Sequence, residues 1–244
     1  MIHYHGGPIW PVTAAFKLWR SRHAFVSFAR PEQIDIAADE AQSFALDNGA
    51  FSAWKSGTVI DWNDYYTWVA EWMRHPGFDF ALIPDVIDGT VADNAELIEQ
   101  WPHDVAGVPV WHMHEPVEWL RDLCHQWPRV ALGSSGAYAT IGTPQWWNRM
   151  ADAMRNACDE HGRPLCKLHG LRMLNPEVFS QLPFSSADST NVAQNITKDQ
   201  KWNGTYKPTR PETKAIVIAE RIEEINSAAF WQGAHQPCMF GGAS

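Results

Sequence analysis

Carboxylate and imidazole side chains recur at the ends of short apolar runs along this chain. Asp47, Asp85 and Asp188 each end such a run, and His112 and His169 end two others. Two carboxylates at one site can divide the roles of nucleophile and general acid or base, and a nearby histidine can bind substrate or move a proton. A single aspartate at such a position is often only a turn residue, so the chemistry depends on whether these side chains converge.

The runs that carry these residues alternate with amphipathic stretches along the chain. Strands are expected at 23–29, 43–47, 78–85, 108–112, 129–133, 165–169 and 184–188, and in an N-terminal segment that contains His3 and His5. Helices are expected at 61–74, 90–101, 116–126, 144–161, 175–181 and 211–228. This alternation predicts a parallel sheet, and the number of units favours a compact (β/α)8 barrel of the TIM type. We therefore expect an α/β protein with residues 1–244 in a single domain.

In such a barrel the carboxyl ends of all strands meet at one mouth, where barrel enzymes carry out their chemistry. The residues expected there are Asp47, Asp85, His112, His114, Gly133, His169, Gly170 and Asp188. Gly133 has no Cβ, so a ligand can approach its backbone closely. Neither GxGxxG nor GxxxxGK[ST] occurs, which removes the two commonest phosphate-binding fingerprints of doubly wound folds.

The composition is that of a globular protein. The 244 residues are 45% hydrophobic and 19% charged, enough apolar mass for a substantial core. No apolar run is long enough to span a membrane, and residues 1–8 lack the basic and apolar segments of a signal peptide. The four cysteines do not form the pattern of a disulfide scaffold, so we expect a cytoplasmic protein with no membrane partner.

The charge is unevenly distributed. The formal net charge is −9, yet residues 163–214 contain eight basic and four acidic side chains. Within this stretch, residues 189–210 are expected to form a long basic loop that can attract a polyanion locally. The candidate phosphate contacts are Lys198, Lys201, Lys207 and Arg210. A solvated loop without a ligand is the alternative interpretation of the same charges.

Five short motifs follow one another in an order that resembles a known family. They are LDNGAF at 46–51, IPD at 83–85, ALGS at 131–134, LHGLRMLNPE at 168–177 and FSSADST at 184–190. Together they resemble the tRNA-guanine transglycosylases, the queuine and archaeosine enzymes, over about residues 43–195. The similarity is greatest to the shorter phage and bacterial branch that inserts 7-deazaguanine bases into DNA.

The resemblance implies a base exchange at an N-glycosidic bond. It assigns the covalent nucleophile to Asp188 and recognition of the guanine-like base edge to Asp85, and Asp47 becomes the candidate acid and base. The family places a Gln at the end of the strand where this chain has Trp111-His112-Met113-His114. We expect His112 to take over that contact.

Two further features of the site are expected on chemical grounds. An aromatic ring, Phe51 or Tyr138, can stack on the base, although Phe51 is equally compatible with the core. A nucleophilic aspartate must be ionised, so it needs donors, and Ser186, Ser189 and Thr190 flank Asp188. Lys167 or Arg172 can add positive charge from the preceding unit.

We expect no metal or other cofactor. The family's zinc site is a cluster of three cysteines and a histidine beyond the nucleophile, where this chain has only His235 and Cys238. The spacing of Cys158 and His161 with Cys166 and His169 is suggestive of zinc, but their predicted helix and strand positions keep them from converging.

The sequence is compatible with other polymers and with other functions. The polymer is expected to be DNA, but tRNA fits the same resemblance. A carboxylate-dependent N-glycosidase or glycoside hydrolase on the same barrel would need no incoming base. A non-catalytic binding module is the third interpretation, because the chain contains 14 tryptophans that can form stacking surfaces. The inserted base and the oligomeric state are left undetermined.

Overall fold

The computed structural model of the protein describes residues 1–198 and 207–233. Within these residues, nine strands form one all-parallel sheet in the order β5-β4-β3-β2-β1-β9-β8-β7-β6. The strands are β1 Ile2–Gly6, β2 His23–Ser27, β3 Ser43–Asp47, β4 Phe78–Leu82, β5 Gly107–Val108, β6 Val110–His112, β7 Arg129–Gly133, β8 Lys167–Gly170 and β9 Ser186–Ser189.

The sheet closes into a barrel through a strand that is interrupted once. The expected strand at 108–112 is divided by Pro109, whose nitrogen cannot donate a hydrogen bond. On one side of the proline, β5 pairs with β4, and on the other side β6 pairs with β7. The Pro109 carbonyl still accepts a 2.9 Å hydrogen bond from the Ala131 N–H. The ring thus has eight strand positions, and the predicted TIM-like barrel is confirmed.

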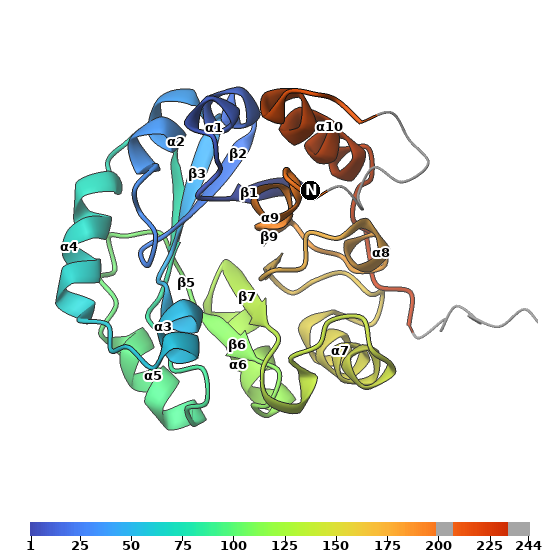
Figure 1. The fold of residues 1–244 in the computed structure, drawn as a ribbon. Coiled ribbons are helices and arrows are strands. Elements are labelled where there is room, and N and C mark those ends of the chain that lie inside the picture. Colours follow the sequence, from blue (N-terminus) through green and yellow to red (C-terminus); the bar gives the residue numbers. More distant parts are fainter. Residues whose placement is uncertain (199–206, 234–244) are drawn as a thin grey trace, which may run out of the picture.

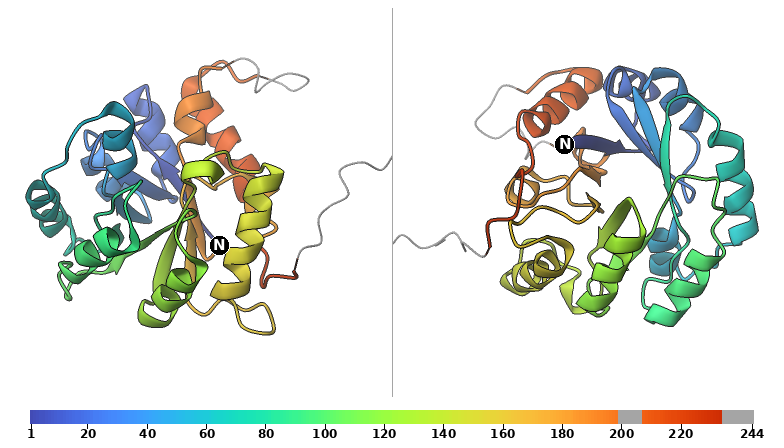
Figure 2. Two further views of the ribbon diagram at one scale, coloured as in Figure 1. Left: turned by 90° about the horizontal axis from the view of Figure 1, so that it is seen from below. Right: turned by 180° about the vertical axis from the view of Figure 1, so that it is seen from behind.

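Most of the helices cover the outside of the ring, and the short α3 and α9 lie nearer its centre in the view of Figure 1 (Figures 1 and 2). They are α1 Val12–Trp19, α2 Ile34–Glu40, α3 Ala50–Ser56, α4 Trp62–Trp72, α5 Val91–Glu99, α6 Val117–Gln126, α7 Pro144–Ala157, α8 Pro176–Phe179, α9 Asn191–Asn195 and α10 Pro211–Glu223, with a 3-10 turn at Gly136–Tyr138. The sequence did not predict α1, α2, α3 or α9, and α7 and α10 end earlier than expected. In the part of the chain that the structure describes, no helix has the length and apolarity to cross a bilayer.

Two separate apolar layers hold the barrel together. Inside the ring, a cluster fills the lumen and consists of Tyr4, Phe25, Ala45, Phe80, Leu82, Val108, Val110 and Ala131. The larger layer lies between the strands and the surrounding helices and contains Leu46, Leu132 and Leu168 among many others. Because alternate strand residues point to opposite faces, β2, β3, β4, β6 and β7 each supply both layers.

The amino ends of the strands form a closed floor. There Arg129 Nη1 donates a 3.0 Å hydrogen bond to Asp79 Oδ2, and the Tyr4 hydroxyl donates to the same oxygen. The Arg129 guanidinium also lies 4.4 Å from the centre of the Phe80 ring. Charge on Asp79 is therefore compensated by a cation and a hydroxyl at this end.

His3 and His5 face outward from β1 toward the last helix. His5 Nε2 lies 2.7 Å from Glu223 Oε1, and the Arg22 Nε donates to the same carboxylate at 2.9 Å. Burial opposes ionisation of Glu223, but these two partners outweigh it and lower its pKa to about 2. His3 Nε2 lies 3.0 Å from the Ile225 carbonyl oxygen. Both histidines thus attach α10 and the residues after it to the barrel.

Candidate functional site

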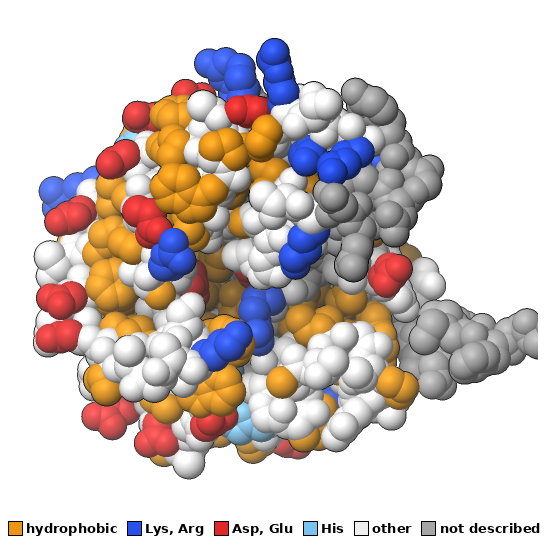
Figure 3. All heavy atoms as spheres, in the orientation of Figure 1, with side chains coloured by type: hydrophobic (Ala, Val, Ile, Leu, Met, Phe, Trp, Pro, Cys, Tyr) orange, Lys and Arg blue, Asp and Glu red, His pale blue; other side chains and the backbone are white. Residues whose placement is uncertain are grey.

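Three aspartates converge at the carboxyl end of the barrel. Asp47 is the last residue of β3, Asp188 is the last but one of β9, and Asp85 follows β4 by three residues. The negative charges of Asp188 and Asp85 both act on the Asp47 carboxyl group. Figure 3 shows Lys and Arg side chains beside a central hollow in the ring. The structure thus brings together the three carboxylates that the sequence analysis selected.

Asp47 has the perturbed acidity of a group that can exchange protons near neutral pH. Burial is the largest cause, and the charges of Asp188 and Asp85 act in the same direction. The Ser27 hydroxyl and the Gly49 N–H oppose them, and the pKa of Asp47 is raised to about 6. A carboxyl group with this pKa can donate a proton and later take one back under the same conditions.

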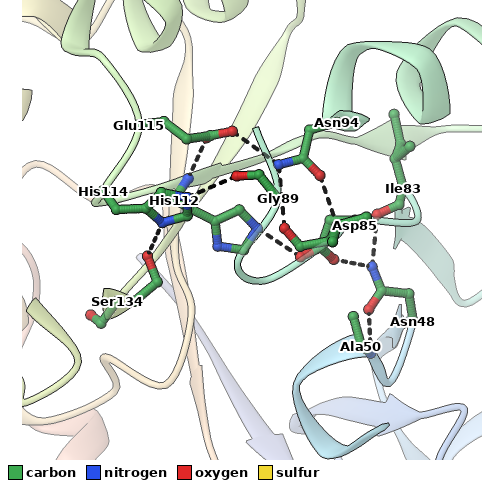
Figure 4. A network of polar contacts seen from close by, with 12 residues as sticks. Asn48, Ala50, Ile83, Asp85, Gly89, Asn94, His112, His114, Glu115 and Ser134 are labelled. Atoms are coloured by element: carbon green, nitrogen blue, oxygen red, sulfur yellow. Dashed lines mark hydrogen bonds and ion pairs between the residues drawn. The ribbon is translucent and has the colours of Figure 1, made fainter. Parts of the chain in front are cut away.

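Asn48 ties the ends of β3 and β4 together, as Figure 4 shows. Its Nδ2 donates to Asp85 Oδ1 at 2.6 Å and to the Ile83 carbonyl at 2.7 Å, while its Oδ1 accepts from the Ala50 N–H at 2.9 Å. Gly49 makes the turn possible, because its φ of 80° is strained for other residues. Asn48 was missed as a functional residue because Asp47-Asn48-Gly49 also has the composition of an ordinary turn.

Asp85 has a second partner in His112, from the neighbouring strand β6. Asp85 Oδ2 and His112 Nε2 lie 2.8 Å apart, and both side chains are buried. Burial opposes protonation of His112, but the contact with Asp85 and the charge of Glu115 outweigh it and raise the pKa of His112. A Cβ at position 133 would lie 3.3 Å from His112 Nδ1, so Gly133 gives the imidazole its room.

Behind this pair lies a second layer of polar groups (Figure 4). The Glu115 carboxylate accepts from the His112 backbone N–H at 2.8 Å and from Asn94 Nδ2 at 2.9 Å. Asn94 Oδ1 in turn accepts from the Val86 N–H at 2.8 Å. Sequence reasoning missed both Glu115 and Asn94. Asn94 could have been found from the sequence, because it lies on the same face of the predicted helix as Ile98. A polar residue on this otherwise apolar face indicates a buried polar contact.

His114 connects two loops at the edge of the mouth. Its Nδ1 lies 2.9 Å from the Ser135 hydroxyl and its Nε2 lies 3.0 Å from the Gly89 carbonyl, so both ring nitrogens have a partner. The ring stacks on His112 at a centroid distance of 5.7 Å. His114 therefore links the loops after β4 and β7 and supports His112 from the solvent side.

Asp188 is held by groups other than the expected hydroxyls. Its Oδ1 accepts from the Arg172 backbone N–H at 2.9 Å and lies 3.4 Å from His169 Nε2. The Ser186 hydroxyl lies 2.8 Å from His169 Nδ1 instead of reaching the carboxylate. The expected donor Ser189 accepts from the Asn191 N–H and so serves the turn that follows.

His169 and Gly170 lie deeper than the sequence suggested. His169 is fully buried in the lumen, where its ring packs against Phe25 and Phe80, so it supports Asp188 from below and lies outside the open mouth. A Cβ on Gly170 would lie 2.6 Å from the Phe184 ring, so packing alone requires glycine there.

Each of the two aromatic candidates for base stacking lies against the guanidinium of an arginine. The Arg172 guanidinium lies 3.9 Å from the centre of the Phe51 ring, and the Arg149 guanidinium lies 5.6 Å from that of Tyr138. Burial lowers the pKa of Arg172, with the charges of Asp188 and Asp47 acting in the opposite direction. Phe51 is thus a platform for a cation on this face.

The described parts of the basic segment, residues 189–198 and 207–210, adjoin the carboxyl end of β9 and the amino end of α10, at the same end of the barrel as the carboxylates. The helix α9 occupies part of the predicted loop. Lys198, Lys207 and Arg210 are in the described part of this segment, whereas Lys201 lies outside the described residues. Among residues 1–198 and 207–233, no three His, Cys, Asp or Glu side chains are grouped to hold a metal ion. His235 and Cys238 lie outside these ranges.

No protein-family model, no curated protein and no solved structure matches the chain. The chemistry proposed for the mouth therefore rests on its own side chains.

Proposed function

We propose that the protein exchanges guanine in a polynucleotide for a 7-deazaguanine base through a covalent bond between Asp188 and the sugar, with DNA as the polymer. One observation carries this proposal. A carboxyl group with a pKa of about 6, Asp47, shares the mouth with a buried carboxylate, Asp188, that is held by an N–H donor. Such a pair can divide the work of proton transfer and nucleophilic attack.

In the first half of the reaction, Asp188 attacks C1′ of the target nucleotide. A new bond forms between the carboxylate oxygen and C1′ while the bond from C1′ to the base nitrogen breaks. Its electron pair leaves with the base and takes the proton of the Asp47 carboxyl group. The Arg172 N–H keeps Oδ1 of Asp188 in place during this step.

In the second half, an incoming 7-deazaguanine base takes the place of the departed base at the mouth. Asp47, now ionised, accepts the proton from its ring nitrogen, which attacks C1′. The bond from C1′ to Asp188 breaks, and the carboxylate is restored. Each carboxyl group ends in the state in which it began, so the cycle needs no cofactor.

Recognition of the base is assigned to Asp85 and His112. Asp85 accepts from Asn48 and lies against His112, and these partners fix both of its oxygens. A fixed carboxylate can accept the amino and ring N–H groups of a guanine-like edge. The target base must be flipped out or single-stranded to reach this depth, because a paired base in a duplex is inaccessible.

The experiment offers radiolabelled guanine and guanine-containing single-stranded DNA, duplex DNA or tRNA to the purified protein. We expect label to enter DNA, and a denaturant-stable protein–DNA adduct to accumulate when the incoming base is omitted. Asp188→Asn should lose both signals, whereas Asp152→Asn, which alters an exposed aspartate of α7, should retain them.

The other outcomes discriminate between functions. Label in tRNA alone would change the polymer and leave the mechanism intact. Release of free base without incorporation would identify a hydrolase, since water would then replace the incoming base. The absence of both exchange and base release from all three polymers would overturn the proposal.

A further inference from the structure

Arg172 places a cation directly beside the proposed nucleophile. Its backbone N–H donates to Asp188 Oδ1 at 2.9 Å, so the start of the side chain is fixed relative to that carboxylate. The residue has a φ of 59°, a left-handed conformation that is costly for a side chain larger than glycine. The position therefore carries a conformational cost that a glycine would avoid.

The side chain spans the mouth from β8 to two other connections. The guanidinium lies 3.9 Å from the centre of the Phe51 ring on α3, and Nη2 donates to the Ser134 carbonyl after β7 at 2.9 Å. The cation–π contact with the ring and the hydrogen bond to the carbonyl hold the guanidinium at this place. Among the residues that the structure describes, no group accepts a hydrogen bond from the remaining donors of this guanidinium.

A fixed arginine with spare donors is suited to one kind of group. A guanidinium matches the geometry of phosphate oxygens in a bidentate contact, better than a lysine ammonium does. In a polynucleotide, the phosphates are attached to the sugar whose C1′ would be attacked. The negative charges of Asp47 and Asp188 disfavour a free anion in the mouth, and Arg172 offsets this repulsion.

We infer that Arg172, held over the Phe51 ring, binds the phosphate adjacent to the sugar that Asp188 attacks. This inference deepens the proposed function, since it rests on Asp188 as the point of attack. It also gives Phe51 a role: the ring orients the arginine. The protein would then select a nucleotide within a chain by its phosphate, in addition to its base.

The test measures binding of a fluorescent, guanine-containing single-stranded oligodeoxynucleotide over a series of salt concentrations, without an incoming base. Arg172→Gln should weaken binding about tenfold at low salt and reduce the slope of log K against log salt by about 0.7, the value for one phosphate contact on a single strand. Arg172→Lys keeps the charge and should keep the slope. Arg20→Gln, at the floor end of α1, should bind like the wild type.

Binding of guanine as the free base provides the second readout. Arg172→Gln should leave it unchanged, because the free base has no phosphate. A loss for the free base as large as for the oligonucleotide would make Arg172 a base contact and overturn the inference. So would an unchanged oligonucleotide affinity and slope in Arg172→Gln, or a wild-type protein that does not bind the oligonucleotide at low salt.

The same data separate this inference from the proposed function. An Arg172-dependent salt slope in a protein that exchanges no base would leave the phosphate site standing and remove the transglycosylase mechanism. Exchange on an oligonucleotide with no dependence on Arg172 would do the reverse.

Discussion

The floor and the mouth of the barrel differ in how their buried charges are compensated. At the floor, Asp79 is neutralised by Arg129 and accepts from the Tyr4 hydroxyl. Burial and the charge of Asp79 raise the pKa of Tyr4 far above its usual value, so this hydroxyl stays a donor. Every charged group in this set has a permanent partner, which is the arrangement of a structural element.

At the mouth, negative charge is left partly uncompensated. Burial and the charges of the neighbouring carboxylates raise the pKa of Asp47, and the partner of Asp85 is a histidine, which itself titrates. Groups with perturbed acidity that face an opening are typical of functional sites. A cluster of aspartates alone therefore does not mark a functional site; what marks it is that their negative charge lacks a permanent positive partner.

The largest effect is expected from removing the nucleophile. Asp188→Asn keeps the acceptor for the Arg172 N–H but cannot form a stable bond to C1′. Exchange should fall more than about 1,000-fold, as for loss of other catalytic nucleophiles. Single-turnover kinetics measure the loss, and circular dichroism checks that the fold is retained. A variant that exchanges at a comparable rate would shift the nucleophile to another residue.

Asp47→Asn is expected to slow exchange by about 100- to 1,000-fold, the usual contribution of a general acid or base. Affinity for the oligonucleotide should change far less, because Asp47 acts on the departing base. A loss confined to KM, with kcat unchanged, would make Asp47 a binding residue instead.

The same substitution should change stability with a defined sign. The pKa of Asp47 is raised from 3.8 to about 6 on folding, so the native state binds more protons than the unfolded chain between these values. The contribution of Asp47 to stability is therefore lost as pH rises from about 4 to about 6. At pH 8, Asp47→Asn should be more stable than the wild type by about 1 kcal/mol, allowing for the solvent-facing part of the carboxyl group. Urea unfolding at pH 4 and pH 8 measures the difference, which should vanish at the lower pH.

At the floor, a substitution should affect stability and leave exchange unchanged. Asp79→Asn removes the half-buried charge that compensates the buried Arg129, and we expect the free energy of unfolding to fall by about 2 kcal/mol. Exchange by the folded fraction should be unaltered. If this variant instead lost exchange without losing stability, the division between a structural floor and a functional mouth would be wrong.

The smallest effect is expected beneath the nucleophile. His169→Phe fills the lumen but removes the contact with Asp188 Oδ1, and should lower kcat/KM about tenfold. His169→Gln can place an amide nitrogen where Nε2 lies and should recover most of the loss. His169→Asn reaches only toward Ser186 and should behave like the phenylalanine variant. Equal rates in all three variants would limit His169 to packing.

The sequence predicted those elements and site residues that have a signal in neighbouring residues, such as an apolar run or a helix cap. The apolar runs 43–47 and 129–133 coincide with β3 and β7 and place Asp47 and Gly133 at strand ends. The four unpredicted helices, α1, α2, α3 and α9, have no side-chain hydrogen bond at their N-caps. By contrast, the predicted helices α4 and α5 begin with the capping side chains of Asp61 and Thr90. Without such a cap, a short helix leaves little trace in the sequence.

The partners of the site residues could not be predicted, because they depend on register between distant strands. Asn48 reaches Asp85 only since β3 and β4 pair as they do, and no local pattern encodes that distance. The depth of His169 is similar: alternation in β8 indicates the lumen face, but only the assembled ring places the imidazole beneath Asp188. A sequence supplies the types of side chain at the mouth, and the closed barrel decides which of them meet.

The attachment of α10 to β1 also has a kinetic consequence. His5 and Glu223 are 218 residues apart in the chain, yet they lie in contact on the outside of the barrel. Contacts between such distant residues form slowly, because a long segment of chain must first be ordered. We therefore expect the outward face of β1 to be covered late in folding. The layer around it is complete only after α10 has docked, when nearly all other units have folded. Until then the outward face of β1 is exposed to wrong partners, which makes this seam the place where folding of the barrel is most easily diverted.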